Sequence, residues 1–123
     1  MNEINKFFSD AEIACQCGKC DFKQSDPVTL QMAYSARLLA NIPFRITSWC
    51  RCPAHNAAVG GTPNSAHTRR KALDIGFRTS GEAHVIVKSL FTAGFLRVGI
   101  NWERNFVHAD TDESLPNPVL FKY

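Results

Sequence analysis

The chain has 123 residues, of which 45% are hydrophobic and 20% are charged. These values are typical of one globular domain with its own core, and they exclude a disordered chain. The 14 Lys and Arg residues exceed the 11 Asp and Glu residues by three, and a net charge of +3 is too small to indicate a dedicated nucleic-acid binder. We therefore predict one domain over residues 1–123, a monomer, and no nucleic-acid partner.

The sequence gives no sign of a membrane or secretion segment. No apolar run approaches the roughly 20 residues that a membrane-spanning helix needs. The N-terminal segment Met1–Lys6 lacks the basic and apolar regions of a secretory signal. We therefore expect that the protein is synthesised in the cytoplasm and does not insert into a membrane. Another agent must release the protein if it acts outside the cell.

Five cysteines fall in two clusters along the chain: Cys15, Cys17, Cys20, Cys50 and Cys52. The first three have the pattern C-x-C-x-x-C, which resembles half of a structural zinc site. A fourth ligand would have to come from a distance, from the second cluster or from His55. Disulfides between the clusters and reduced thiols are the alternatives, and an odd number of cysteines prevents complete pairing within one chain. We expect no second zinc ion at Cys15, Cys17 and Cys20.

Helices come first among the predicted elements. Ser9 and Glu12 form a capping box, which predicts a short helix, and the cysteine triplet after it indicates an irregular loop. Asp26 as the N-cap and Pro27 at the first helical position predict a longer helix that ends near Asn41.

Strands and two further helices follow. Four short segments have the composition of strands: 44–48, 72–77, 96–100 and 106–110. Residues 53–59, closed by two glycines, predict a short helix, and Thr79 with Glu82 caps a helix that runs to Gly94. Residues 115–118 indicate a surface extension. This order predicts the α+β class, with helices packed on a small antiparallel sheet.

Two of the four histidines stand near carboxylates in these segments. His67 lies in the turn before the second strand and Asp74 lies within that strand, while His108 shares a strand face with Asp110. Two imidazoles and one carboxylate would leave a tetrahedral zinc ion one position for water, as in catalytic sites. Such an ion favours hydrolysis, because it acidifies water and polarises a carbonyl. Spacing alone is equally consistent with three unrelated polar residues.

Four stretches resemble, in the same order, the motifs of a known family. Residues 65–74 resemble the S-x-H-x-x-G-x-A-x-D signature of the zinc D,D-carboxypeptidase and D-stereospecific peptidase family, peptidase family M15. Residues 106–110 resemble its second metal motif. Residues 46–53 and 55–61 are similar to the S-G-x-R-x-P and H-N-x-x-V-G-G segments of the branch found among phage and bacterial cell-wall hydrolases. The resemblance covers about residues 8–112.

The resemblance implies a zinc metallopeptidase that uses metal-activated water to cut peptidoglycan stem peptides next to D-amino acids. It would be a D-Ala-D-Ala carboxypeptidase or an endolysin-type endopeptidase, and both a phage and a host origin stay open. His67, Asp74 and His108 match the ligands of one catalytic Zn²⁺. Arg51 matches the arginine that steadies the scissile carbonyl or the substrate carboxylate, and Ser65 matches the signature serine, which lines the substrate pocket or holds the turn. The alternative is a non-catalytic cell-wall or protein-binding module with a structural zinc.

Two positions depart from the family pattern. Arg70 stands where the signature has glycine, so the turn must accept a positive φ without glycine or take another shape. Asn105 stands where several members carry a glutamate that acts as the general base. Asp110, on the face of His108, and Glu103, in the loop before that strand, are the candidate replacements. Asp110 would serve either as the base or as a group that orients a ligand.

Overall fold

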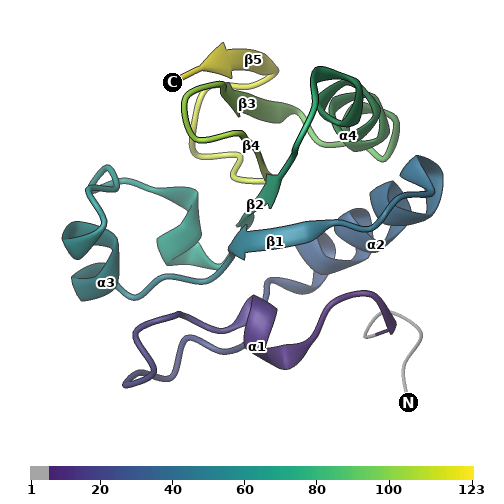
Figure 1. Ribbon diagram of the computed structural model, residues 1–123. Helices are drawn as coiled ribbons and strands as arrows, with labels where there is room; N and C mark the ends of the chain where they lie inside the picture. Colours follow the sequence, from purple (N-terminus) through teal and green to yellow (C-terminus); the bar gives the residue numbers. More distant parts are fainter. Residues whose placement is uncertain (1–5) are drawn as a thin grey trace.

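The computed structural model describes residues 6–123, which contain ten helices and strands joined by turns and loops (Figure 1). In chain order they are α1 (Asp10–Ile13), α2 (Pro27–Ala40), β1 (Arg45–Ser48), α3 (Pro53–Ala58), the 3-10 helix η2 (Ala66–Arg69), β2 (Ala72–Gly76), α4 (Ser80–Thr92), β3 (Arg97–Asn101), β4 (Phe106–Asp110) and β5 (Val119–Lys122). The predicted α+β class is confirmed. The prediction that the N-terminal segment is not a secretory signal concerns residues 1–6, and residues 1–5 lie outside the described residues.

The helices begin at the residues that their caps predict. At α1, the Glu12 backbone N–H donates to the Ser9 side chain over 3.1 Å and the Ser9 backbone N–H donates to Glu12 over 2.9 Å. At α2, the Thr29 backbone N–H donates to the Asp26 carboxylate over 3.0 Å. Each cap satisfies backbone donors that have no partner inside the helix. α2 ends at Ala40, and its C-cap Asn41 takes a left-handed conformation with a φ of 54°.

The five strands form one sheet in the order β1-β2-β4-β3-β5. The first three pairings are antiparallel, and β5 adds to β3 in parallel. Strand β5 was not predicted, and its parallel pairing makes the sheet mixed rather than purely antiparallel as expected. In the register, both Asp74 on β2 and Gly99 on β3 lie opposite His108 on β4. The pairing of β2 with β4 therefore places Asp74 beside His108.

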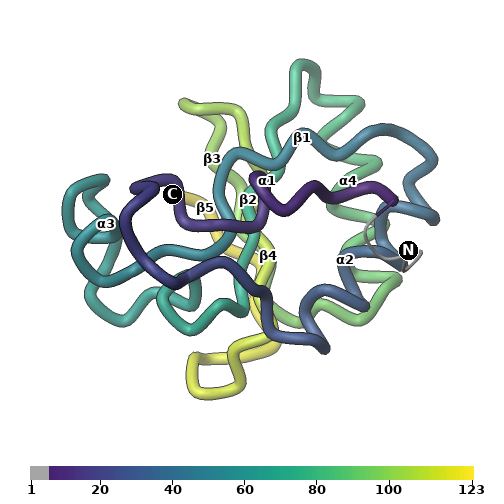
Figure 2. Tube along the Cα trace, turned by 90° about the horizontal axis from the view of Figure 1, so that it is seen from below, coloured from purple at the N-terminus to yellow at the C-terminus, as the bar shows by residue number. Residues whose placement is uncertain are grey.

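One face of the sheet carries the core, and the other carries polar groups. Leu73, Val98 and Val107 are fully buried in the core, and their chain neighbours point to the opposite face because side chains alternate along a strand. Helices α2 and α4 lie against each other on one side of the sheet, and α3 lies away from them (Figures 1 and 2). Among the described residues, no helix is both long enough and apolar enough to span a membrane.

Candidate metal centre

Three potential metal ligands from separate elements converge beside the sheet. His67 comes from η2, Asp74 from β2 and His108 from β4, and one ligand atom of each lies within 4.8 Å of the others. Asp74 Oδ1 is 3.2 Å from His67 Nε2 and 3.0 Å from His108 Nδ1. The sheet register places Asp74 opposite His108, and η2 packs against β2 to bring His67 to them. This group of two imidazoles and one carboxylate has a donor set that suits zinc.

The outer nitrogen of each imidazole is held by an oxygen atom. His67 Nδ1 is 2.6 Å from the Trp49 carbonyl oxygen, and His108 Nε2 is 2.7 Å from Asp110 Oδ2. A carbonyl oxygen can only accept, so His67 Nδ1 carries a proton, and the Asp110 carboxylate likewise favours a proton on His108 Nε2. The inner nitrogens, His67 Nε2 and His108 Nδ1, are then the ones that can bind a metal ion.

The buried carboxylate of Asp74 needs a positive charge beside it in this group of three residues. His67, Asp74 and His108 are only 1%, 7% and 6% exposed. Burial by itself lowers the pKa of His108, but the hydrogen bonds and charges of Asp110 and Asp74 outweigh it and raise that pKa to about 9. Burial by itself raises the pKa of Asp74, but the charges and hydrogen bonds of both histidines hold it below its ordinary value. Either a proton or a metal ion can supply the positive charge, so the residues fit a divalent ion.

Asp110 lies behind His108 and is fully buried. One oxygen contacts His108, while Arg97 Nε lies 2.9 Å from Oδ1 and 3.1 Å from Oδ2. The backbone N–H of Asp112 also donates to Asp110 Oδ1, over 3.1 Å. Both carboxylate oxygens are therefore occupied by groups of the protein. This position suits a group that orients His108 and holds its outer proton.

The other candidate base, Glu103, lies in the turn between β3 and β4 and is exposed. It does not belong to the group of three convergent ligands. Asn105 ends the same turn with a φ of 57°, and its carbonyl accepts from the Phe77 backbone N–H over 2.9 Å. Asparagine takes this left-handed conformation more readily than most residues, which accounts for an amide at the position where several family members carry glutamate.

Arg51 and Ser65 both contact the backbone of His67. The Arg51 backbone N–H donates to the His67 carbonyl over 3.1 Å, and the His67 backbone N–H donates to Ser65 Oγ over 3.2 Å. Ser65 is the N-cap of η2, so it holds the turn that carries His67. The Arg51 side chain is half-buried, and its Nε–H has no partner among the described residues. Burial lowers the pKa of Arg51, against the opposing effect of the Asp74 charge.

Arg70 adopts the left-handed backbone that the family motif reserves for glycine. Its φ is 65°, and its backbone N–H donates to the carbonyls of Ala66 and His67 at the end of η2. The arginine side chain lies over the Phe22 ring, with 4.4 Å between the guanidinium carbon and the ring centroid. The turn therefore keeps a positive φ without glycine, which was the first of the two predicted possibilities.

Sequence reasoning missed a partner of Asp110 and an aromatic neighbour of His108. Arg97 binds Asp110 from β3, as described above, and Tyr123 follows β5 with its ring centroid 6.5 Å from that of His108. The pairing of β3 with β4 could have indicated Arg97, because the register sets it opposite Asp110. Nothing in the sequence signalled Tyr123, since β5 itself was not predicted.

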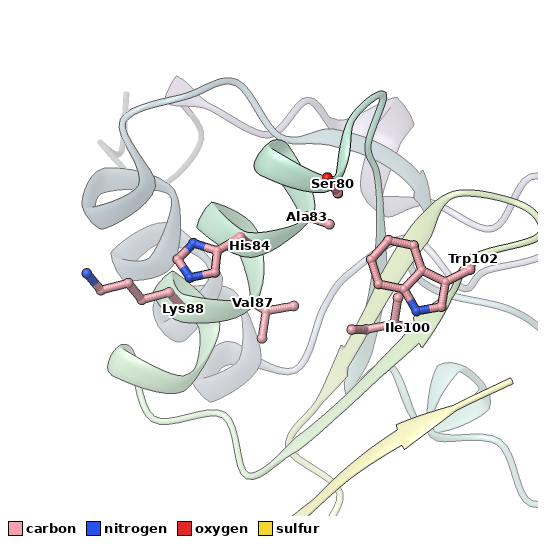
Figure 3. A pocket seen from close by; sticks show the side chains of 7 residues that line it. All are labelled: Ser80, Ala83, His84, Val87, Lys88, Ile100 and Trp102. Atoms are coloured by element: carbon pink, nitrogen blue, oxygen red, sulfur yellow. The ribbon is translucent and has the colours of Figure 1, made fainter.

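A separate cavity of about 410 Å³ lies between α4 and β3 (Figure 3). Its wall includes His84 from the helix, Ile100 from β3 and the exposed Trp102. Ile100 is the chain neighbour of Gly99, which lies opposite His108, so it points to the other face of the sheet. This cavity is therefore not part of the metal centre.

Comparison with known proteins agrees with this geometry. A family model described as Peptidase M15 matches residues 6–110, which include all three convergent ligands. A search of curated proteins found no match. The family match covers most of the chain and implies peptide substrates. The chain belongs to the peptidase M15 family of metallopeptidases, and its group of two histidines and one aspartate is the place where this hydrolase can bind a metal ion.

Proposed function

We propose that this protein is a zinc peptidase that hydrolyses peptide bonds next to D-amino acids in peptidoglycan stem peptides. The convergence of His67, Asp74 and His108, in a chain of the M15 family, carries the proposal. Three protein ligands leave one position of a tetrahedral zinc ion for water, which is typical of catalytic rather than structural sites. We assign the three residues as zinc ligands.

When bound, zinc would lower the pKa of a water molecule towards about 7 and polarise the peptide carbonyl. The surrounding protein keeps the ligands ready for this. The Trp49 carbonyl and the Asp110 carboxylate fix the two imidazoles with their inner nitrogens facing Asp74. Arg97 in turn holds the Asp110 carboxylate in place, because its Nε lies about equally close to both carboxylate oxygens. We therefore assign Asp110 the role of a positioning residue.

Arg51 supplies positive charge for the substrate. The side chain is half-buried, and its Nε–H has no hydrogen-bond partner among the described residues, so the guanidinium keeps unused donor capacity. We assign it to the scissile carbonyl oxygen or to the terminal carboxylate of a D-amino acid. A donor that is already in place and partly desolvated stabilises negative charge better than water does. The Arg51 backbone N–H is hydrogen-bonded to the His67 carbonyl, so this residue is anchored next to a proposed zinc ligand.

The proton acceptor must be a carboxylate other than the zinc ligand Asp74. Because both oxygens of Asp110 are occupied, Glu103 is the remaining candidate from the sequence analysis. It projects from the exposed turn between β3 and β4, where no protein group competes for it among the hydrogen bonds and ion pairs of the described residues. We assign the proton-accepting role to Glu103.

The substrate determines where the protein must act. Peptidoglycan lies outside the cytoplasmic membrane, so the proposal requires release of the protein to the cell wall. Delivery of a phage-encoded endolysin through a partner pore would meet this requirement.

The decisive experiment is digestion of purified peptidoglycan by the zinc-loaded protein, with mass spectrometry of the products. Free D-Ala would indicate a carboxypeptidase, and shortened or uncrosslinked stem peptides would indicate an endopeptidase. His67→Ala and His108→Ala should each abolish product formation and lose one zinc ion per chain. Binding to the wall without any fragments would instead support the non-catalytic binding module. Unchanged zinc content in both variants would contradict the ligand assignment.

A further inference from the structure

Four of the five cysteines converge in a second group, outside the metal centre described above. The Sγ atoms of Cys15, Cys17, Cys20 and Cys52 all lie within 4.8 Å of one another. Cys17 Sγ is 3.4 Å from Cys20 Sγ and 3.9 Å from Cys52 Sγ. Zinc–sulfur bonds of about 2.3 Å in a tetrahedron place sulfur atoms about 3.8 Å apart. The observed spacings lie on either side of that value, so the four sulfur atoms have room for one zinc ion at their centre.

Backbone donors already point at three of these sulfur atoms. The Lys19 N–H donates to Cys17 Sγ over 3.3 Å, the Cys52 N–H donates to Cys15 Sγ over 3.4 Å, and the His55 N–H donates to Cys52 Sγ over 3.4 Å. Hydrogen bonds to sulfur stabilise the thiolate, which is the form that binds metal ions. Such donors would also share the negative charge that four thiolates leave around a divalent ion.

The fold brings the fourth cysteine to the other three. Gly18, with a φ of 70°, turns the loop between Cys17 and Cys20 in a conformation that a side chain would strain. This loop runs beside the segment that leads into α3, whose N-cap is Cys52 (Figure 2). Cys50 is not part of the group, because its thiol donates to the Gln24 carbonyl over 3.5 Å.

We propose that Cys15, Cys17, Cys20 and Cys52 bind a structural zinc ion. Four protein ligands fill a tetrahedral zinc ion and leave no position for water, so this site is closed, in contrast to the catalytic one. All five cysteines are free thiols in the structure. The proposal replaces our expectation from the sequence of a single zinc ion, which rested on the lack of a local fourth ligand.

The structural zinc ion would connect the N-terminal loop to residues 49–52. This short segment holds the Trp49 carbonyl, which binds His67, and Arg51. The ion therefore fixes the backbone from which both groups approach the catalytic site. Its effect on Arg51 rests on the proposed peptidase function, but the binding of zinc by the four cysteines does not.

Metal analysis of the full-length protein, purified under reducing conditions, tests the site. Wild type should contain two zinc ions per chain, while Cys17→Ser, Cys20→Ser and His67→Ala should each contain one. Cys50→Ser is the matched control and should retain both ions. Cobalt substitution separates the two sites, because only thiolates give a strong sulfur-to-cobalt charge-transfer band. That band should persist in His67→Ala and disappear in Cys20→Ser, whatever the outcome for peptidase activity.

A measurement on the unmodified chain covers the case in which the serine variants fail to fold. Titration of wild type with a mercurial that reacts with thiols should release one zinc ion as the four clustered cysteines react. One zinc ion per chain in wild type without the cobalt–thiolate band would overturn the proposal. Disulfides between the clustered cysteines in protein kept under reducing conditions, detected as a loss of two mass units for each bond, would also overturn it.

Discussion

His108 is bound on both sides of its ring, and this arrangement decides what Asp110 can do. Asp74 lies 3.0 Å from Nδ1 and Asp110 lies 2.7 Å from Nε2. A carboxylate bonded to the outer nitrogen of a metal ligand makes the inner nitrogen more basic and holds the ring in place. If Asp110 turned towards the substrate, it would leave both the Arg97 Nε–H and the His108 Nε2–H without a partner inside the protein. The cost of burying those groups unpaired favours a fixed Asp110.

Two variants separate the positioning residue from the proton acceptor. Asp110→Asn should lower zinc affinity by about 10–100-fold, because the ligand His108 loses its charged partner. Glu103→Gln should retain zinc at wild-type affinity and lower kcat by about 10²–10⁴-fold, since an amide accepts no proton. Chelator competition measures the affinity, and kcat is measured on a stem peptide with saturating zinc. If Asp110→Asn kept wild-type zinc affinity and lost all turnover, Asp110 would be the acceptor instead.

The motifs of the sequence indicated more about the metal ligands than about the groups that hold them. His67, Asp74 and His108 occur at fixed positions of the family motifs, so the resemblance named them. The partner of His67 is a backbone carbonyl, that of Trp49, and any residue type can supply a carbonyl. Cys52 is a similar case, because only the folded loop shows that it lies beside Cys17. Contacts between distant segments, rather than residue types, determine these parts of both sites.

At the scale of elements, the turn from η2 to β2 connects two of the three proposed zinc ligands. His67 lies within η2, and Arg70 ends that helix with a φ of 65° before β2 brings Asp74. A left-handed backbone costs an L-residue with a side chain roughly 1–2 kcal/mol. Arginine offsets part of this cost, because its guanidinium lies 4.4 Å from the ring centroid of Phe22. The replacement of glycine by Arg70 therefore adds strain to the turn but does not change the conformation of its backbone.

Substitution at this turn separates the backbone strain from the side-chain contact. Arg70→Ala and Arg70→Gly both remove the contact with Phe22, but only glycine relieves the positive φ. We expect Arg70→Gly to be more stable than Arg70→Ala by about 1 kcal/mol, as measured by urea unfolding of the zinc-loaded proteins. Equal stability of the two variants would show that the turn changes conformation when the arginine is removed.

Strand β5 shows which kind of element the sequence does not reveal. The caps and alternating segments that predicted the other elements are local signals, and they placed four strands and the two long helices correctly. β5 is a four-residue edge strand, and its parallel pairing with β3 is fixed by contacts across the chain, such as the Val119 N–H donating to the Leu96 carbonyl over 2.8 Å. Gly99 leaves space for the Phe121 ring, because a Cβ atom there would lie 2.3 Å from it. That fit between strands appears only in the folded chain.

At the scale of the whole molecule, folding gathers acceptor groups that need positive charge. The cluster of His67, Asp74 and His108 buries two imidazoles and a carboxylate, and the second cluster collects four thiols. Without metal, protons must supply this charge, so folding, metal binding and pH are linked. Zinc at both sites would then contribute to the stability of the fold as well as to catalysis.

The metal-free protein should lose stability as pH rises from about 6.5 to about 9. Folding raises the pKa of His108 from 6.5 to about 9, so its contribution to stability is complete below pH 6.5 and disappears as pH rises through 9. A shift of this size corresponds to at most about 3 kcal/mol. Urea unfolding of chelator-treated protein at both pH values measures the loss. His108→Asn is the control, because this variant loses the imidazole but keeps the cysteines, whose ordinary pKa of about 8.5 in an unfolded chain falls in the same range. An equal loss of stability in this variant would show that His108 does not bind the proton.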